Sequence, residues 1–309
     1  MRTRSHPYNG KQRGFVLVAV LLSVSILVTG SLALAWFSRT ELRKAEATAF
    51  SLEARSLAET VVHAARKGLV LDGNAYDSPL EPWFSTWPVP LGTAASVTVA
   101  LAPQNRALPL AGLFLPDGST LRRELEGPWE TLWEEAGKPG LAPVVLDFLD
   151  ADRTPRPGGS ETDSCINRAP SALEELLLCP GIDESLYYGK NGKARPGLGR
   201  LLTVQGDGRI NFNAAHPEAL ALLDPSLTPG VIREIVERRA KKPLEGWEDL
   251  AGIPGFPPGL RPRLDGLVSF ASSHFLAEIE VRKGTLVRRF EAVLVKDSGR
   301  CRISSWKER

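Results

Sequence analysis

The side chains that most often carry catalysis or bind transition metals are few and scattered in this sequence. Its four histidines lie far apart, and its three cysteines form no C-x-x-C pair. Zinc sites need such ligands at short, regular spacings. The sequence also contains no G-x-S-x-G or H-E-x-x-H motif, and these motifs mark common nucleophilic and metal-dependent active sites. We therefore predict that the protein is not an enzyme and holds no zinc.

Carboxylates gather in one stretch that is rich in Gly and Pro, Asp150 to Asp163. Asp150 and Glu161 have the spacing of the first and last ligands of an EF-hand loop. Pro155, however, stands where that loop needs glycine, and no suitable helices flank the stretch. The residues therefore exclude an EF-hand. They leave two interpretations, a loop that binds a hard cation through its oxygens and a solvated acidic loop.

The charge balance limits the class of partner. The 309 residues include 38 Lys+Arg and 36 Asp+Glu, which gives a formal net charge of +2. Nucleic-acid binding needs a strong positive field, so we expect no nucleic-acid partner. A chain of this length is sufficient for about one to three domains with cores of their own.

The segment from Phe15 to Phe37 is apolar and contains no charged residue. As a helix it would be roughly 34 Å long, which is sufficient to cross a bilayer. Its upstream flank is basic without acids, whereas its downstream flank mixes both signs. This bias predicts a cytoplasmic N-terminus and a large C-terminal body on the other side of the membrane. The apolar run is too long for a cleaved secretory signal, and a plain membrane anchor is the simplest alternative.

The residues before the apolar run suggest a more specific interpretation. Lys11-Gln12-Arg13-Gly14-Phe15 places a basic leader and a glycine directly against the start of the run, and this resembles the class III signal of type IV pilins and pseudopilins. The resemblance implies that residues 1–14 are a leader peptide. A prepilin peptidase would cut between Gly14 and Phe15, and the transmembrane helix of residues 15–37 would stay in the product. Glycine fits the cut because it lets the scissile backbone be approached closely.

One common feature of these families is missing. Most pilins and pseudopilins carry Glu at the fifth residue after the cut, where this chain has Ala19. In the family this Glu is understood to pair with the free amine of a neighbouring subunit. A carboxylate inside a bilayer is costly unless it is paired. The absence therefore fits a subunit at the end of a filament, and it fits a non-pilin anchor equally well.

The helical pattern continues beyond the apolar run. Between Phe15 and Lys67 the sequence has no Pro and only one Gly, Gly30. Apolar residues recur at helical spacing in two stripes, and charged residues fill the other side. The stripes are Leu42, Ala45, Ala49 and Leu52, and Phe50, Ala54, Leu57, Val61 and Ala64. This pattern predicts one amphipathic helix that continues from the membrane segment.

Strand patterns flank a middle region with helical patterns. Residues 96–101 alternate as a strand, and the tail alternates in three runs that predict antiparallel strands at 275–281, 286–295 and 301–306. Helices are predicted in between, including residues 128–136, 171–178, 217–223 and 229–241. A small sheet interrupted by an inserted helical domain fits this order.

Several segments together resemble one family, the minor pseudopilin K of type II secretion systems. They are the class III start without Glu, Leu146–Asp152, Pro157–Glu161, Gly208–Leu220 and Ser273–Phe275. The resemblance implies an α+β fold in which a long N-terminal helix packs on a small antiparallel sheet. The pilin-like domain would comprise residues 38–105 and 272–309, and a large α-helical insertion would comprise residues 106–271.

The resemblance also implies a function and partners. A minor pseudopilin of this kind acts at the tip of the periplasmic pseudopilus, where it initiates assembly and supports protein export across the outer membrane. Its partners would be the minor pseudopilins I and J, the major pseudopilin G, the prepilin peptidase, secreted substrates and the outer-membrane secretin. The protein would be a single-pass protein of the inner membrane with a periplasmic body.

Calcium is a further implication of the resemblance. The loop that starts at Asp150 is the expected place, because it is rich in Gly and Pro and can fold around one ion. The expected ligands are Asp150, Asp152, Glu161 and Asp163.

Two cysteines lie close together in the same region. Cys165 and Cys179 enclose thirteen residues, and a periplasmic body is in a compartment that permits disulfides. We predict a disulfide between them, which would leave Cys301 over. Two free thiols are the alternative.

A rival interpretation concerns residues 208–268, which also resemble a helix-hairpin-helix module of membrane-anchored competence DNA receptors. Such modules offer hairpin N–H groups to phosphate. Here Pro225 and Pro229 remove donors, and Asp224 repels phosphate. We therefore prefer a packing module used for protein contact. A competence-type DNA receptor and a minor pilin of another type IV filament are the alternative functions.

Overall fold

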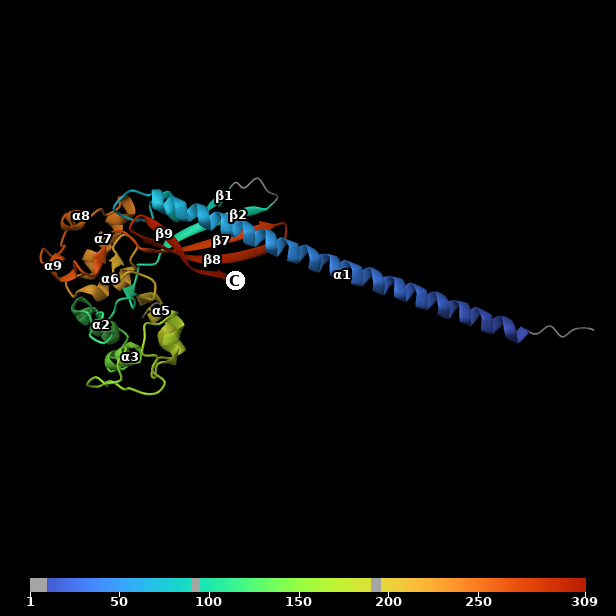
Figure 1. Ribbon diagram of the computed structural model, residues 1–309, viewed down its shortest axis with the longest axis horizontal. Helices are drawn as coiled ribbons and strands as arrows, with labels where there is room; N and C mark the ends of the chain where they lie inside the picture. Colours follow the sequence, from blue (N-terminus) through green and yellow to red (C-terminus); the bar gives the residue numbers. More distant parts are fainter. Residues whose placement is uncertain (1–9, 90–94, 190–195) are drawn as a thin grey trace, which may run out of the picture.

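The structure is a computed structural model that describes residues 10–89, 95–189 and 196–309, with side chains from residue 15 onward. Most of the predicted leader, residues 1–9, lies outside the described residues. Helix α1 (Gly10–Leu71) is one uninterrupted rod of 62 residues. Its N-terminal half extends away from the folded body, and its C-terminal half lies along a sheet (Figure 1).

The sheet has five antiparallel strands in the order β1-β2-β7-β8-β9. Their bounds are β1 (Trp87–Val89), β2 (Ser96–Pro103), β7 (His274–Lys283), β8 (Leu286–Asp297) and β9 (Arg300–Glu308). The three C-terminal strands form hairpins, and Ser298 and Gly299 of the last turn both have a positive φ. Strand β2 pairs with β7 from Ser96↔Arg282 to Pro103↔Phe275, so the start and the end of the body share one sheet.

Residues at alternate positions of these strands face α1. They form an apolar core with the helix that includes Phe50, Val61, Val99, Ile279 and Phe290. Alternation produces this face because successive strand side chains point to opposite sides of a sheet. The predicted strands are therefore present, and each is longer than the alternation indicated by one or two residues at one or both ends.

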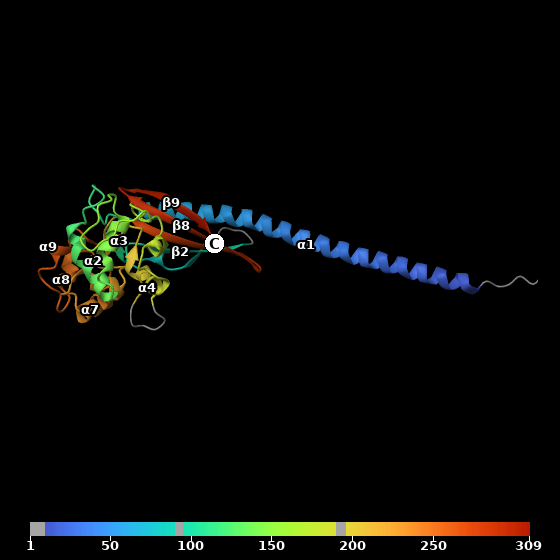
Figure 2. The same cartoon turned by 90° about the horizontal axis from the view of Figure 1, so that it is seen from below.

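The chain between β2 and β7 forms a second body at the end of the sheet far from the start of α1 (Figures 1 and 2). Its α-helices are short and are joined by loops. They are α2 (Arg123–Glu135), α3 (Leu141–Leu149), α4 (Glu184–Tyr188), α5 (Leu198–Leu201), α6 (Pro217–Leu223), α7 (Pro229–Lys241), α8 (Trp247–Ala251) and α9 (Arg261–Leu264). Two 3₁₀ helices, η1 (Pro82–Phe84) and η2 (Leu173–Leu178), lie before β1 and between α3 and α4.

Two very short parallel strand pairs complete this body. They are β3 (Leu108–Pro109) with β4 (Leu202–Thr203) and β5 (Ile210–Asn211) with β6 (Val268–Ser269). The body has its own hydrophobic cluster, which draws on residues from Leu108 to Val268 and includes Trp129, Trp133, Phe148 and Phe212. We refer to it as the inserted body, and to α1 with the five-stranded sheet as the pilin-like half.

Two predicted helices in the inserted body need correction. The helix predicted at 128–136 begins earlier, at Arg123, so Pro128 lies inside α2 and removes one backbone hydrogen bond of its second turn. The residues predicted as a capped α-helix at 171–178 form the 3₁₀ helix η2 instead. Ser171 and Glu174 have the spacing of a capping box, but the Ser171 amide donates to Glu175 at 3.3 Å instead, so that box does not form.

Candidate functional site

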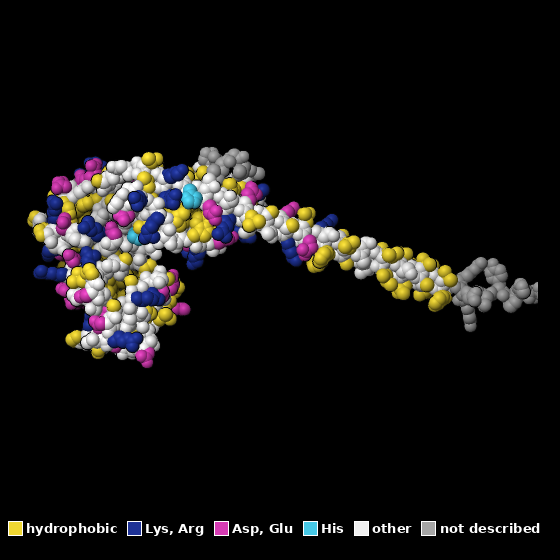
Figure 3. All heavy atoms as spheres, viewed as in Figure 1, with side chains coloured by type: hydrophobic (Ala, Val, Ile, Leu, Met, Phe, Trp, Pro, Cys, Tyr) yellow, Lys and Arg dark blue, Asp and Glu magenta, His cyan; other side chains and the backbone are white. Residues whose placement is uncertain are grey.

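The outer half of α1 is the first functional feature. The segment Phe15–Leu71 is, in the part of the chain that the structure describes, the one helix long and apolar enough to cross a membrane. All residues from Phe15 to Arg39 are exposed and touch no other part of the fold. Apolar side chains cover this part of the rod in the space-filling view (Figure 3). The bond between Gly14 and Phe15 lies within α1.

The inner half of α1 has two apolar faces, of which one is buried and the other is exposed. One face packs on the sheet and includes Phe50, Ala54 and Val61, all nearly fully buried. The predicted stripe of Leu42, Ala45, Ala49 and Leu52 stays exposed, with 61% of Leu42 and 69% of Leu52 accessible. At about 100° per residue these two sets lie on opposite sides of the helix. We call the exposed set the open face of α1.

The acidic loop forms a compact group in the inserted body. Asp147, Asp150 and Glu161 each offer a carboxylate oxygen, and these oxygens lie within 4.8 Å of one another. Asp147 and Asp150 lie three residues apart at the end of α3, so they share one face of that helix. Both side chains are fully buried, with 0% exposure. Glu161 reaches the group from the loop that folds back over α3.

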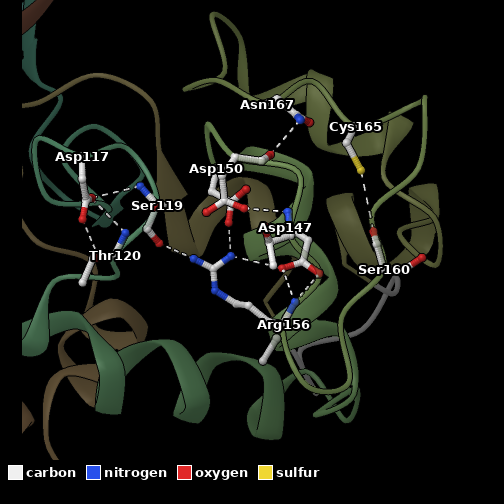
Figure 4. A network of polar contacts seen from close by, with 12 residues as sticks. Asp117, Ser119, Thr120, Asp147, Asp150, Arg156, Ser160, Cys165 and Asn167 are labelled. Carbon is white, nitrogen blue, oxygen red and sulfur yellow. Dashed lines mark hydrogen bonds and ion pairs between the residues drawn. The ribbon is translucent and has the colours of Figure 1, made fainter.

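Arg156 contacts both aspartates of this group, as Figure 4 shows. Its guanidinium forms an ion pair with Asp147 at 3.1 Å and another with Asp150, and it donates to the Ser119 carbonyl. Its backbone amide also donates to the Asp147 carboxylate at 3.1–3.2 Å. The loop approaches so closely that a Cβ at Gly159 would collide with that carboxylate, so glycine is required there.

The group carries more negative charge than Arg156 can neutralise. Three carboxylates face one guanidinium. Burial raises the pKa of Asp150 above its ordinary value, although Arg156 opposes the shift. Burial and the charges of Asp150 and Asp147 likewise raise the pKa of Glu161. Oδ1 of Asp150 and Oε1 of Glu161 are buried and have no hydrogen-bond partner among the described residues. Such oxygens suit a hard divalent cation.

Two of the four predicted ligands belong to this group. The structure brings Asp150 and Glu161 together but leaves Asp152 and Asp163 exposed and outside the group. The Asp152 carboxylate accepts the Thr154 amide of its own turn at 2.7 Å, which holds it away. Asp147, which was not predicted, is the third member of the group. Its only signal in the sequence is a single acid within the apolar run of residues 141–149, where a charge that is buried needs a partner.

The cysteines differ from the prediction. Cys165, Cys179 and Cys301 are free thiols, so the predicted Cys165–Cys179 disulfide is not formed in this structure. Cys165 Sγ lies 3.7 Å from the Ser160 carbonyl oxygen, and Cys179 packs in the hydrophobic cluster of the inserted body. Burial, with a smaller contribution from Cys165, raises the pKa of the Cys179 thiol to about 12. A thiol with that pKa reacts slowly.

The region resembling helix-hairpin-helix modules uses its hairpin polar groups internally. The Asp224 carboxylate accepts the amide of Ser226 at 2.9 Å and pairs with Arg263 at 3.1 Å. An N–H group that already bonds a carboxylate does not serve a phosphate, and the carboxylate repels one. This geometry does not favour the DNA-receptor interpretation.

Comparisons with known proteins add one match. No protein-family model matches the chain, and no curated protein matches its sequence. Among solved structures, it is similar to a chain of the crystal structure of the GspK-GspI-GspJ complex from the enterotoxigenic Escherichia coli type 2 secretion system. The TM-score is 0.63 at 16% identity, and the match covers 88% of this chain and 99% of that chain. At this identity the match shows a shared fold. It confirms the predicted fold class, a pilin-like long helix on an antiparallel sheet with an inserted body.

Proposed function

We propose that the chain is a minor pseudopilin of a type II secretion system that acts at the tip of the periplasmic pseudopilus. The observation that carries this proposal is the division of α1 into a covered face and an open face. The open face continues the exposed membrane-spanning segment and offers small and apolar side chains to a neighbouring helix. A helix that only anchored the body would need no such face. The shared fold supports the same role.

The position at the tip has two supports. The inserted body lies at the end of the sheet far from the membrane-spanning segment (Figures 1 and 2), where it would obstruct a further subunit stacked above. In addition, Ala19 replaces the Glu that pairs with a neighbouring subunit in most pilins. A subunit at the apex lacks that neighbour and gains nothing from a carboxylate in lipid. In this role the chain initiates pseudopilus assembly and supports protein export across the outer membrane.

The proposed partners follow from the same role. The similar solved structure is a GspK-GspI-GspJ complex, and we propose that this chain assembles with minor pseudopilins I and J above the major pseudopilin G. The prepilin peptidase would process it, and secreted substrates and the secretin would meet its inserted body. The protein would lie in the inner membrane with its N-terminus in the cytoplasm.

The open face gives the sharpest test of this proposal. We would co-express the full chain with its candidate minor pseudopilins I and J and measure the amount of complex recovered. Leu42→Lys and Leu52→Lys place a charge on the open face and should reduce recovery on the order of tenfold. Thr48→Lys is a matched control, because Thr48 is exposed on a flank of the same helix segment. Equal recovery from all three variants would contradict the proposal.

The processing step has its own test. Mass spectrometry of the full chain, expressed with an active prepilin peptidase, should show a mature product that starts at Phe15. A product that still starts at Met1 would contradict the class III interpretation.

We also propose that the carboxylate group binds calcium. Asp147, Asp150 and Glu161 would hold the ion, and the two uncompensated negative charges of the group match its charge. Calcium prefers oxygen ligands of this kind and tolerates irregular loops. Bound there, it would supply positive charge that ties the loop of residues 151–161 to α3. Its role would be structural.

Isothermal titration of the full chain with CaCl₂ tests the calcium proposal. The wild-type chain should bind one ion, and Asp147→Asn should weaken binding on the order of tenfold or more. Asp163→Asn is the control, because it removes an equal charge from the same loop but outside the group. If Asp163→Asn weakened binding as much as Asp147→Asn, general loop charge would explain the binding.

A further inference from the structure

A second polar feature lies at the junction between the pilin-like half and the inserted body. A cavity of about 320 Å³ opens there, and none of its lining residues belongs to the carboxylate group. Its basic lining consists of Arg106, Arg200 and His216. Arg106 lies between β2 and β3, and Arg200 belongs to α5. His216 is the N-cap residue of α6, and its amide donates to the Arg106 carbonyl at 2.9 Å, so these two residues are held side by side.

Arg106 is the unusual member of this lining. Its side chain is half-buried, yet its guanidinium forms no hydrogen bond or ion pair within the part of the chain that the structure describes. Burial lowers the pKa of Arg106, with the nearby positive charge of Arg200 adding to the shift and Glu278 opposing it. Removing a cation from water without a hydrogen-bonded partner destabilises a fold. The guanidinium therefore has donors available to a ligand in the cavity.

The other titratable groups that line the cavity are Arg200, His216 and one carboxylate, Glu174. Arg200 pairs with Glu218 at 3.3 Å but remains half-exposed. The Glu174 carboxylate lies near Tyr187, and burial together with this carboxylate raises the pKa of Tyr187 to about 12. Burial, followed by Arg106, Arg200 and Arg239, lowers the pKa of His216 to about 4, against the opposing charge of Glu218. The imidazole is thus neutral at neutral pH and retains one N–H donor.

We propose that this cavity binds an oxyanion, a carboxylate or a phosphate-like group, with the Arg106 guanidinium as its principal donor and His216 and Arg200 as supporting groups. A planar guanidinium matches two oxygens of such a group in parallel hydrogen bonds. The ligand would supply the acceptors that Arg106 lacks and would link the pilin-like half to the inserted body.

Titration of the full chain in lipid nanodiscs tests the proposal. Sodium sulfate, sodium phosphate and sodium succinate would be compared with sodium chloride at constant ionic strength. At least one of the three oxyanions should bind saturably, and Arg106→Gln should weaken that binding on the order of tenfold or more. Arg209→Gln is the matched control, because Arg209 is exposed and outside the cavity lining.

The outcomes distinguish a carboxylate ligand from a tetrahedral oxyanion. Tighter binding of succinate would assign the cavity to a carboxylate, and tighter binding of phosphate or sulfate to a tetrahedral oxyanion. Absence of saturable binding by all three anions, or equal affinity in Arg106→Gln and wild type, would overturn the proposal.

Two further measurements exclude a merely structural role for Arg106. Without added oxyanion, Arg106→Gln should unfold at a higher temperature than wild type, because it removes an unpartnered, half-buried charge. NMR titration should show the pKa of His216 rising from about 4 when the oxyanion is bound. A lower unfolding temperature for the variant, or a His216 pKa unchanged by saturating anion, would contradict the proposal.

Discussion

The pilin-like half and the inserted body bury their backbone polar groups in different ways. In the pilin-like half, long strands and one long helix satisfy these groups among themselves, and the core between them is apolar. In the inserted body the elements are short, so side chains complete the hydrogen bonding. Arg122 donates to the carbonyls of Gly112, Gly208 and Gly266, and Arg239 donates to those of Phe212 and Ala215.

This difference follows from the rule that buried backbone groups must find partners. Where regular elements are long, the partners are other backbone groups. Where the elements are short, charged and amide side chains take that role, and the stability of the fold then depends on the charge state of those side chains. We therefore expect the pilin-like half to be insensitive to calcium and pH, and the inserted body and the junction to respond to both.

The largest effect is expected in the pilin-like half. Phe290 is 1% exposed and stacks near Trp306 with ring centroids 5.4 Å apart. Phe290→Ala should lower the stability of this half by about 3–5 kcal/mol, because it leaves a cavity in an apolar core. Hydrogen exchange should speed up in α1 and β7–β9, with and without calcium. Equal loss of protection in α2 and α3 would show that the two bodies do not unfold separately.

Arg156→Ala should produce the next largest effect, located in the inserted body. It leaves the buried carboxylates of Asp147 and Asp150 without their ion-pair partner. This should lower the free energy of unfolding by about 3 kcal/mol in calcium-free buffer. Calcium should restore part of this stability, as thermal unfolding would show. Arg153→Ala, an exposed change in the same loop, should have little effect. A destabilisation of Arg156→Ala that calcium did not reduce would contradict the expected contrast.

Asp77→Asn tests the junction. Unlike the two preceding variants, it should raise the stability of the protein at neutral pH. Burial raises the pKa of Asp77 to about 6, although the Ser272 amide that it accepts at 2.7 Å opposes the shift. Because the folded state holds this proton more tightly than the unfolded state, the contribution of Asp77 to the stability of the fold is greatest at low pH. It falls as pH rises from about 4 through 6.

At pH 7 the Asn variant should therefore be more stable than wild type, by on the order of 2 kcal/mol. The gain should disappear below pH 4. Chemical denaturation at several pH values measures the difference. A gain that was the same at pH 3 and pH 7 would exclude titration of Asp77 as its cause.

The smallest effect is expected at a helix cap. Thr228 Oγ1 accepts the Val231 amide at the start of α7. Thr228→Ala should cost about 1 kcal/mol, whereas Thr228→Ser should be nearly neutral because it keeps the acceptor. Hydrogen exchange confined to the first turn of α7 would measure this. If Ser were as damaging as Ala, the methyl packing of Thr228 rather than its hydroxyl would be responsible.

The same contrast explains what could be predicted from the sequence. The long helix follows from the absence of Pro between Phe15 and Lys67, and the hairpins follow from alternation and turn residues, because both signals are local. Asp147 could not be found in this way. Its carboxylate meets Arg156 and Glu161 only after a loop folds back over α3 at Gly159. Asp152 lies outside the carboxylate group because its carboxylate accepts a backbone amide of its own turn.

The continuity of α1 has a mechanical consequence. Its 62 residues correspond to a strut roughly 93 Å long with no Pro at which it could bend. The sheet is fastened to the last third of this strut, and the inserted body is fastened to the sheet. Any displacement of the N-terminal segment along the axis of α1 would therefore move the distal body by the same distance.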